Sequence, residues 1–113
     1  MFGRKKPETY TGVAITPGHP VELAREPGPH RRAVGLTLHD NGNVTIDCCD
    51  GGPLVEDMMG DADYERVCTV EAKHVPRLAA ALLHARFAGD PQAVDRLKAL
   101  CDAYGIKAQI TSW

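Results

Sequence analysis

Three carboxylates alternate at Asp61, Asp63 and Glu65, the spacing with which a calcium-binding loop supplies its first ligands. A loop of that kind, counted from Asp61, requires glycine at its sixth position and glutamate at its twelfth. Arg66 and Ala72 occupy those two positions in this chain. The residues at the required spacing therefore argue against a calcium site, and we expect no metal there.

His39 and Asp47 are the residue types of a general acid-base pair. The hairpin described below pairs Asp47 with Gly35, four positions from His39, so at about 3.3 Å per residue their Cα atoms lie about 13 Å apart. That distance excludes a hydrogen-bonded dyad. The chain also has no His-x-x-x-His motif, nucleophile elbow or glycine-rich phosphate loop. We expect no enzymatic activity and no cofactor.

The cysteines are Cys48, Cys49, Cys68 and Cys101, and they lack the paired Cys-x-x-Cys spacing of a zinc site. No secretory signal accompanies them, and no apolar run approaches the roughly 20 residues that cross a bilayer. We therefore expect a cytoplasmic protein with reduced, packing thiols and no membrane partner. A small metal or thiol protein that uses His39, Asp47 and the cysteines is the least favoured of the three functions that we consider.

Charge is strongly segregated along the chain. Residues 33–65 contain eight acids and no lysine or arginine, whereas residues 1–32 and 66–113 each carry a net charge of +3. Carboxylates at this density cannot all be buried without partners. They favour a surface that attracts a cationic protein. The expected partner-binding residues are Asp50, Glu56, Asp57, Met58, Met59, Asp61, Asp63, Tyr64 and Glu65.

Two features of this acidic stretch leave alternatives open. Met58 and Met59 form either a helical turn that closes the core or an adaptable apolar anchor for the partner. The basic residues of the first 32 positions could also fold back over the acids. Nucleic acid is not an expected partner, because the acidic middle of the chain would repel phosphate.

Residues 33–49 have the pattern of a β-hairpin. A two-residue turn at Asn41 and Gly42 would place apolar residues opposite polar ones, whereas a three-residue loop over 40–42 pairs Leu38 with Val44. The same register pairs Leu36 with Ile46 and Val34 with Cys48, and it gives Gly42 the left-handed position of a bulged turn. The apolar pattern therefore predicts the three-residue loop.

The other elements follow from periodicity and from the positions of proline and glycine. Residues 1–32 form a Pro/Gly-rich lead-in, weakly ordered or with one edge strand, for which 11–16 is the candidate. Residues 33–113 form a single α+β domain, with further strands over 64–72 and 106–113 and helices over 76–87 and 91–104. The expected fold is an antiparallel sheet of four to five strands with the two helices packed on one face.

From about Asp47 onward, the motifs "GPLVED", "GDADYE", "HVPRL", "RFAGD" and "GIKAQITSW" resemble a group of small bacterial proteins. That group is similar to the immunity proteins that neutralise bacterial toxins. This chain departs from it at "ERVC", at "MMG" and at the Cys48–Cys49 doublet. The resemblance implies a bacterial, non-catalytic inhibitor that occludes a basic toxin domain. An accessory protein that assembles through the same surface is the second alternative.

Overall fold

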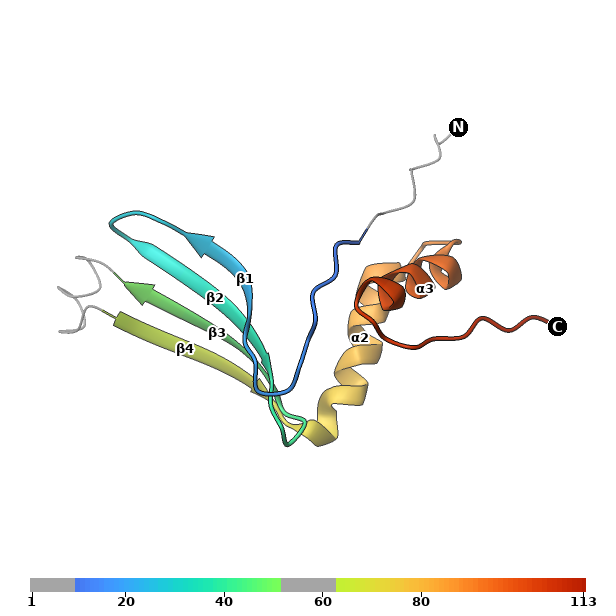
Figure 1. Ribbon diagram of the computed structural model, residues 1–113, viewed down its shortest axis with the longest axis horizontal. Coiled ribbons are helices and arrows are strands. Elements are labelled where there is room, and N and C mark those ends of the chain that lie inside the picture. Colours follow the sequence, from blue (N-terminus) through green and yellow to red (C-terminus); the bar gives the residue numbers. More distant parts are fainter. Residues whose placement is uncertain (1–9, 52–62) are drawn as a thin grey trace. The chain divides into compact units, whose positions relative to one another are not determined.

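The computed structural model describes residues 10–51 and 63–113. For residues 63 and 64 it describes the backbone only. It has the expected α+β class, with a four-stranded antiparallel sheet and two helices in the C-terminal half (Figure 1). The chain divides into two compact units. One comprises residues 15–80 and holds the sheet; the other comprises residues 1–14 and 81–113. The helix α2 (Val75–Phe87) contributes to both.

The sheet consists of neighbouring antiparallel strands in chain order, β1 (Val21–Glu26), β2 (Arg31–Leu38), β3 (Val44–Gly51) and β4 (Asp63–Val70) (Figure 1). The predicted hairpin register is confirmed, since Leu38 pairs with Val44, Leu36 with Ile46 and Val34 with Cys48. The predicted strand over 64–72 corresponds to β4.

The predicted three-residue loop is also confirmed. The His39 amide donates to the Asn43 carbonyl at 2.8 Å, and the Gly42 amide donates to the His39 carbonyl at 2.9 Å. Gly42 has φ +90°, a conformation that a Cβ disfavours. The Asn43 side chain accepts a hydrogen bond from the Ala72 amide at 2.8 Å, so the loop is tied to the short 3-10 helix η1 (Ala72–His74).

Two predicted strands are absent from the described residues. Residues 11–16 are irregular, and the edge strand of the lead-in is β1 instead, placed between Pro20 and Pro27 so that neither proline enters it. Residues 106–113 are likewise irregular despite their alternating pattern. A strand requires a hydrogen-bonding neighbour as well as propensity, and the described part of the unit that holds 106–113 contains no strand.

Strand register divides the sheet into two faces. Alternation places one set of side chains on an apolar face, whose central members are Val34, Leu36, Leu38, Val44, Ile46, Cys48, Cys68 and Val70. The polar face carries the other set, which includes Ala33, Gly35, Thr37, Thr45, Asp47, Cys49, Glu65, Val67 and Thr69. Ile46 on the apolar face remains 46% exposed, so burial of this face within the described residues is incomplete.

The helical unit is organised around two glycine-terminated helices. After α2, Gly89 adopts φ +78°, and the Asp90 carboxylate accepts a hydrogen bond from the Gln92 amide at 2.9 Å. The helix α3 (Ala93–Ala103) begins two residues later than predicted, because Asp90 caps a preceding turn rather than the helix itself. At its end, hydrogen bonds from Ile106 to Cys101 and from Gly105 to Asp102 form a Schellman motif.

Packing in the helical unit centres on Phe87, the one buried hydrophobic side chain among the described residues. The Arg86 guanidinium lies 5.2 Å from the Phe87 ring centroid and donates a hydrogen bond to the Tyr10 hydroxyl at 3.0 Å. Leu82 of α2 is 59% exposed. Cys101 is half-buried. The apolar stripe of α2 is therefore only partly packed.

Candidate functional site

One end of the sheet gathers the charged residues of all four strands. Glu26 pairs with Arg32 and Arg32 with Asp50, all on the apolar-face side of the register, and Arg31 pairs with Gly51 on the polar-face side. The backbones of Tyr64 and Asp63 are the β4 register partners of Asp50 and Gly51. We call this region, residues 25–32, 49–51 and 63–66, the charged end of the sheet.

Asp50 is held by an arginine from the neighbouring strand. Arg32 donates from Nε to Asp50 Oδ1 at 2.5 Å and from Nη2 to Oδ2 at 3.0 Å. The Cys48 thiol also donates to Asp50 Oδ1, at 3.6 Å. The hydrogen bonds from Arg32 hold the pKa of the Asp50 carboxyl below its usual value, against the opposing effect of desolvation. The Asp50 side chain is 21% exposed, so this expected partner-binding residue is engaged within the sheet.

The structure describes only some of the other expected partner-binding residues. Glu65 is exposed, and it makes no ion pair with another described residue. The backbones of Asp63 and Tyr64 begin β4. Gly51 and Asp63, which flank residues 52–62 in the sequence, are register partners at the charged end. The remaining predicted residues, Glu56, Asp57, Met58, Met59 and Asp61, lie outside the described residues.

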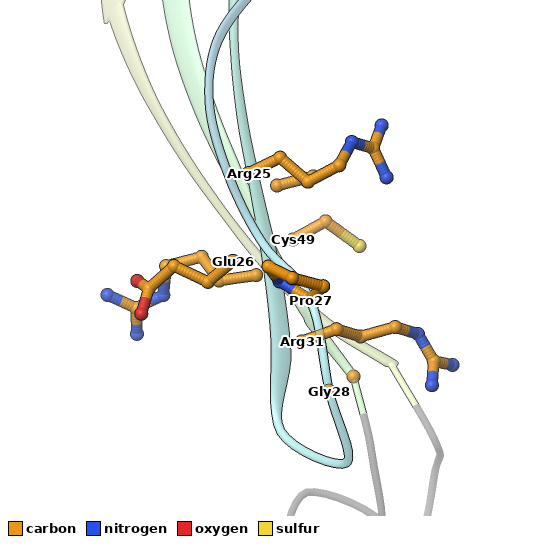
Figure 2. A pocket seen from close by; sticks show the side chains of 9 residues that line it. Arg25, Glu26, Pro27, Gly28, Arg31 and Cys49 are labelled. Carbon is orange, nitrogen blue, oxygen red and sulfur yellow. The ribbon is translucent and has the colours of Figure 1, made fainter.

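A hollow opens on the polar face at the charged end. Its volume is about 320 Å³, and its lining comes from the end of β1, the β1–β2 turn, β2 and β3. Figure 2 shows the side chains of Arg25, Cys49 and Arg31 projecting to the same side of the sheet, while Glu26 projects to the other. We call this hollow the arginine pocket; its lining is Arg25, Glu26, Pro27, Gly28, Arg31, Arg32, Ala33, Cys49 and Gly51.

The acid-base candidates are separated as the register predicted. Asp47 pairs with Gly35, and a Cβ at Gly35 would lie 3.0 Å from the Asp47 Oδ1. His39 Nε2 lies instead 2.9 Å from the Thr45 hydroxyl. Across residues 10–51 and 63–113, no cluster of three or more His, Cys, Asp or Glu side chains is arranged to hold a metal ion.

The sequence left open that basic residues among the first 32 cover the acids, but neither the specific Arg32–Asp50 pair nor the pocket was predicted. The pair could have been predicted, because extending the predicted hairpin register by one further step on the same face, beyond Val34 and Cys48, places Arg32 opposite Asp50. The pocket could not be predicted, because β1 was not predicted and Arg25 therefore had no assigned neighbour on an adjacent strand. Arg31 and Arg32 are neighbours in the sequence, but strand alternation sends their side chains to opposite faces of the sheet.

Comparisons with known proteins add no family assignment. No protein-family model matches the chain, and neither the curated proteins nor the solved structures gave a match. Among the helices in the described residues, none is long and apolar enough to cross a membrane.

The Arg32–Asp50 pair predicts a specific pH dependence. Because the folded pKa of Asp50 is lowered, the pair stabilises the fold above the unfolded pKa of about 3.9 and loses this effect as the pH falls through the folded pKa. Asp50→Asn is therefore expected to lower the free energy of unfolding at neutral pH, with a difference from the native chain that shrinks on acidification. Urea unfolding across the acid range measures this difference.

The matched control is Asp40→Asn, which removes the charge of an exposed carboxyl that has no ion pair with a described residue. This variant should show a much smaller pH-dependent difference. A stability deficit of Asp50→Asn that stays constant down to acid pH would contradict an ionic contribution from the pair.

Proposed function

We propose that this protein is a non-catalytic protein-binding module, an immunity-type inhibitor that occludes a cationic toxin domain through the acidic sequence of residues 50–65. The observation that carries the proposal is the register partnership of Gly51 and Asp63. These two residues flank residues 52–62 in the sequence, and they lie at one end of the sheet together with the exposed Glu65. The inhibitor role itself rests on the motif resemblance described above.

Charge at this position favours a basic partner. From residue 52 to residue 65 the sequence contains five acids and no lysine or arginine. Arg32 is occupied by Asp50, so its charge is already balanced by a residue outside that stretch. Carboxylates concentrated in this way speed the approach of a cationic protein and orient it, and screening weakens the effect over a Debye length of about 8 Å at physiological salt.

The apolar contribution to binding has two candidate sources. Met58 and Met59 lie within the acidic sequence and Tyr64 follows it, and side chains of these types form adaptable or large apolar contacts. The apolar face also offers Ile46, which is 46% exposed, and the exposed Cys68 on the neighbouring strand. A cationic partner that extended from the charged end along the apolar face as far as Ile46 and Cys68 would gain both electrostatic steering and apolar burial.

Charge reversal tests the proposal. Co-purification from the native host with mass spectrometry identifies the bound protein, which is then purified and its association rate is measured at low and physiological salt. The variant Asp61→Lys/Asp63→Lys is expected to associate at least about tenfold more slowly at low salt, because electrostatic steering commonly contributes one or more orders of magnitude. Thermal melting establishes that the variant is folded.

The control is Asp40→Lys/Asp95→Lys, which makes the same change in net charge at exposed positions outside residues 50–65. It should associate at close to the native rate. Equal slowing of both variants would show that the effect comes from net charge alone and not from the position of the acids. An unchanged rate for Asp61→Lys/Asp63→Lys would rule out this surface, and a bound protein without a basic face would rule out the partner class.

A further inference from the structure

We propose that the arginine pocket binds a compact organic or inorganic oxyanion, held between Arg25 and Arg31 above Cys49. This site is separate from the acidic surface assigned to a protein partner. That surface is proposed to bind a cationic protein, whereas the pocket lies on the polar face and is proposed to bind an anion. Its volume of about 320 Å³ is at the small end of the range for ligand-binding sites in proteins.

The hollow arises from a row of small residues between longer ones. Register places Arg25 beside Ala33 and Ala33 beside Cys49 across three strands of the polar face. Two residues further along, Arg31 lies beside Gly51. Ala33, Cys49 and Gly51 therefore make a low floor, and the two arginine side chains project from the same side of the sheet around it (Figure 2).

Arg31 is the cation most available to a ligand. It makes no ion pair or side-chain hydrogen bond with another described residue. Its Nε, Cζ and Nη2 atoms would lie 3.1–3.2 Å from a Cβ at Gly51, so the guanidinium rests over that glycine. The planar group presents a fork of N–H donors that matches a carboxylate or a phosphoryl group.

Arg25 is only weakly engaged. Its Nε donates to Glu22 Oε1 at 2.6 Å, but the two side chains are 67% and 54% exposed. An exposed pair of this kind contributes little, because water competes for both groups. Arg32, which also lines the pocket, is bound to Asp50 through two hydrogen bonds and is not available in the same way.

Carboxylates around the pocket restrict the size of the ligand. Glu22 and Asp47 both pair with Gly35, in the next row of the polar face, and Glu65 pairs with Cys49 on the β4 side. A long polyanion such as a nucleic acid would extend over these negative groups. A small dicarboxylate or a phosphate fits between the arginines without reaching them, which is why we assign a compact oxyanion.

Two probes, inorganic phosphate and succinate, test the site by isothermal titration calorimetry and by protection of Cys49. The full native chain is alkylated with the neutral reagent iodoacetamide, and modification of Cys49 is measured by fragmentation mass spectrometry. If only phosphate protects Cys49 from alkylation and gives a heat of binding, the ligand is a phosphoryl compound. If only succinate does so, the ligand is a carboxylate. A probe concentration of about 10 mM would detect binding even with a Kd of several millimolar. Absence of binding of both probes at that concentration would overturn the proposal.

Three variants assign the binding to the two arginines. Arg31→Gln should weaken binding about tenfold or more, the loss expected for a charge-assisted, two-pronged contact. Arg31→Lys, which keeps the charge and loses the planar fork, should fall between the native chain and Arg31→Gln. Glu22→Gln should tighten binding by up to about fivefold, because it releases Arg25 from an exposed ion pair.

The matched control is Arg77→Gln, which removes one positive charge at another exposed position of the same unit. Its affinity for the probe should equal that of the native chain. Equal weakening by Arg31→Gln and Arg77→Gln would overturn the site in favour of a general charge effect. A weaker affinity for Glu22→Gln would also contradict the assigned role of Arg25.

Discussion

Replacing Gly12 with alanine is expected to release the segment around Tyr10 from the helical unit and to destabilise that unit by about 1–3 kcal/mol, the usual cost of forcing an added methyl group into a packed site. A Cβ at Gly12 would overlap the carbonyl oxygen of Ala103, and it would lie 3.0 Å from the Tyr104 amide nitrogen. Both are backbone atoms at the end of α3, so no side-chain rotation relieves the overlap.

The backbone around this contact is fixed from both sides. Ala103 is the last residue of α3, and the Schellman motif that follows sets the direction of the chain through Gly105. Gly12 does not have a positive φ, so the penalty is steric and not conformational. Displacement of the segment would also break the hydrogen bond between Arg86 and the Tyr10 hydroxyl.

Amide hydrogen exchange measures the effect separately in each unit. Protection in α3 should fall in Gly12→Ala, while protection in β2 and β3 should stay at the native level. Thr11→Ala, at the exposed neighbouring position, is the control and should change little. Equal protection of α3 in the two variants would show that Gly12 is not packed against Ala103.

Replacing Gly42 with alanine is expected to destabilise the sheet unit by about 1–2 kcal/mol from backbone conformation alone, because its φ of +90° brings a Cβ too close to the following carbonyl. A second effect adds to this. The new Cβ would lie 3.0 Å from the Cβ of Ala72, in the segment that the Asn43 side chain holds against the loop.

A double-mutant cycle separates the two effects. Ala72→Gly should recover the steric part of the loss in a Gly42→Ala background and leave the backbone part in place. Urea unfolding monitored by amide exchange in β2 and β3 gives the four stabilities. Native stability of Gly42→Ala would contradict the positive φ, and a cycle without coupling would contradict the contact with Ala72.

Much of the sheet could be predicted from residues 33–49, because its signals are local. A one-residue change of register would move every apolar side chain of the hairpin to the other face, so the pairing of Leu36 with Ile46 is strongly specified. Gly89 and Gly105 marked the ends of the helices for a similarly local reason, since each has a positive φ after a helix.

Prediction failed where an element depends on a distant partner. Residues 106–113 alternate as a strand does, but alternation describes the side chains and supplies no edge for hydrogen bonding. Residues 21–26 carry a weak pattern between two prolines and nevertheless form β1, because β2 offers them an edge. Propensity for a strand is therefore insufficient without knowledge of the neighbouring backbone.

The same distinction holds for the candidate sites. The sequence alone determined the segregation of charge and the concentration of acids between residues 50 and 65, because charge depends only on residue type. Tertiary structure decided that Asp50 binds Arg32, and that Arg25 and Arg31 flank one hollow. These groupings arise when strands distant in sequence pair in a particular register, and residue type carries no information about which side chains that register brings together.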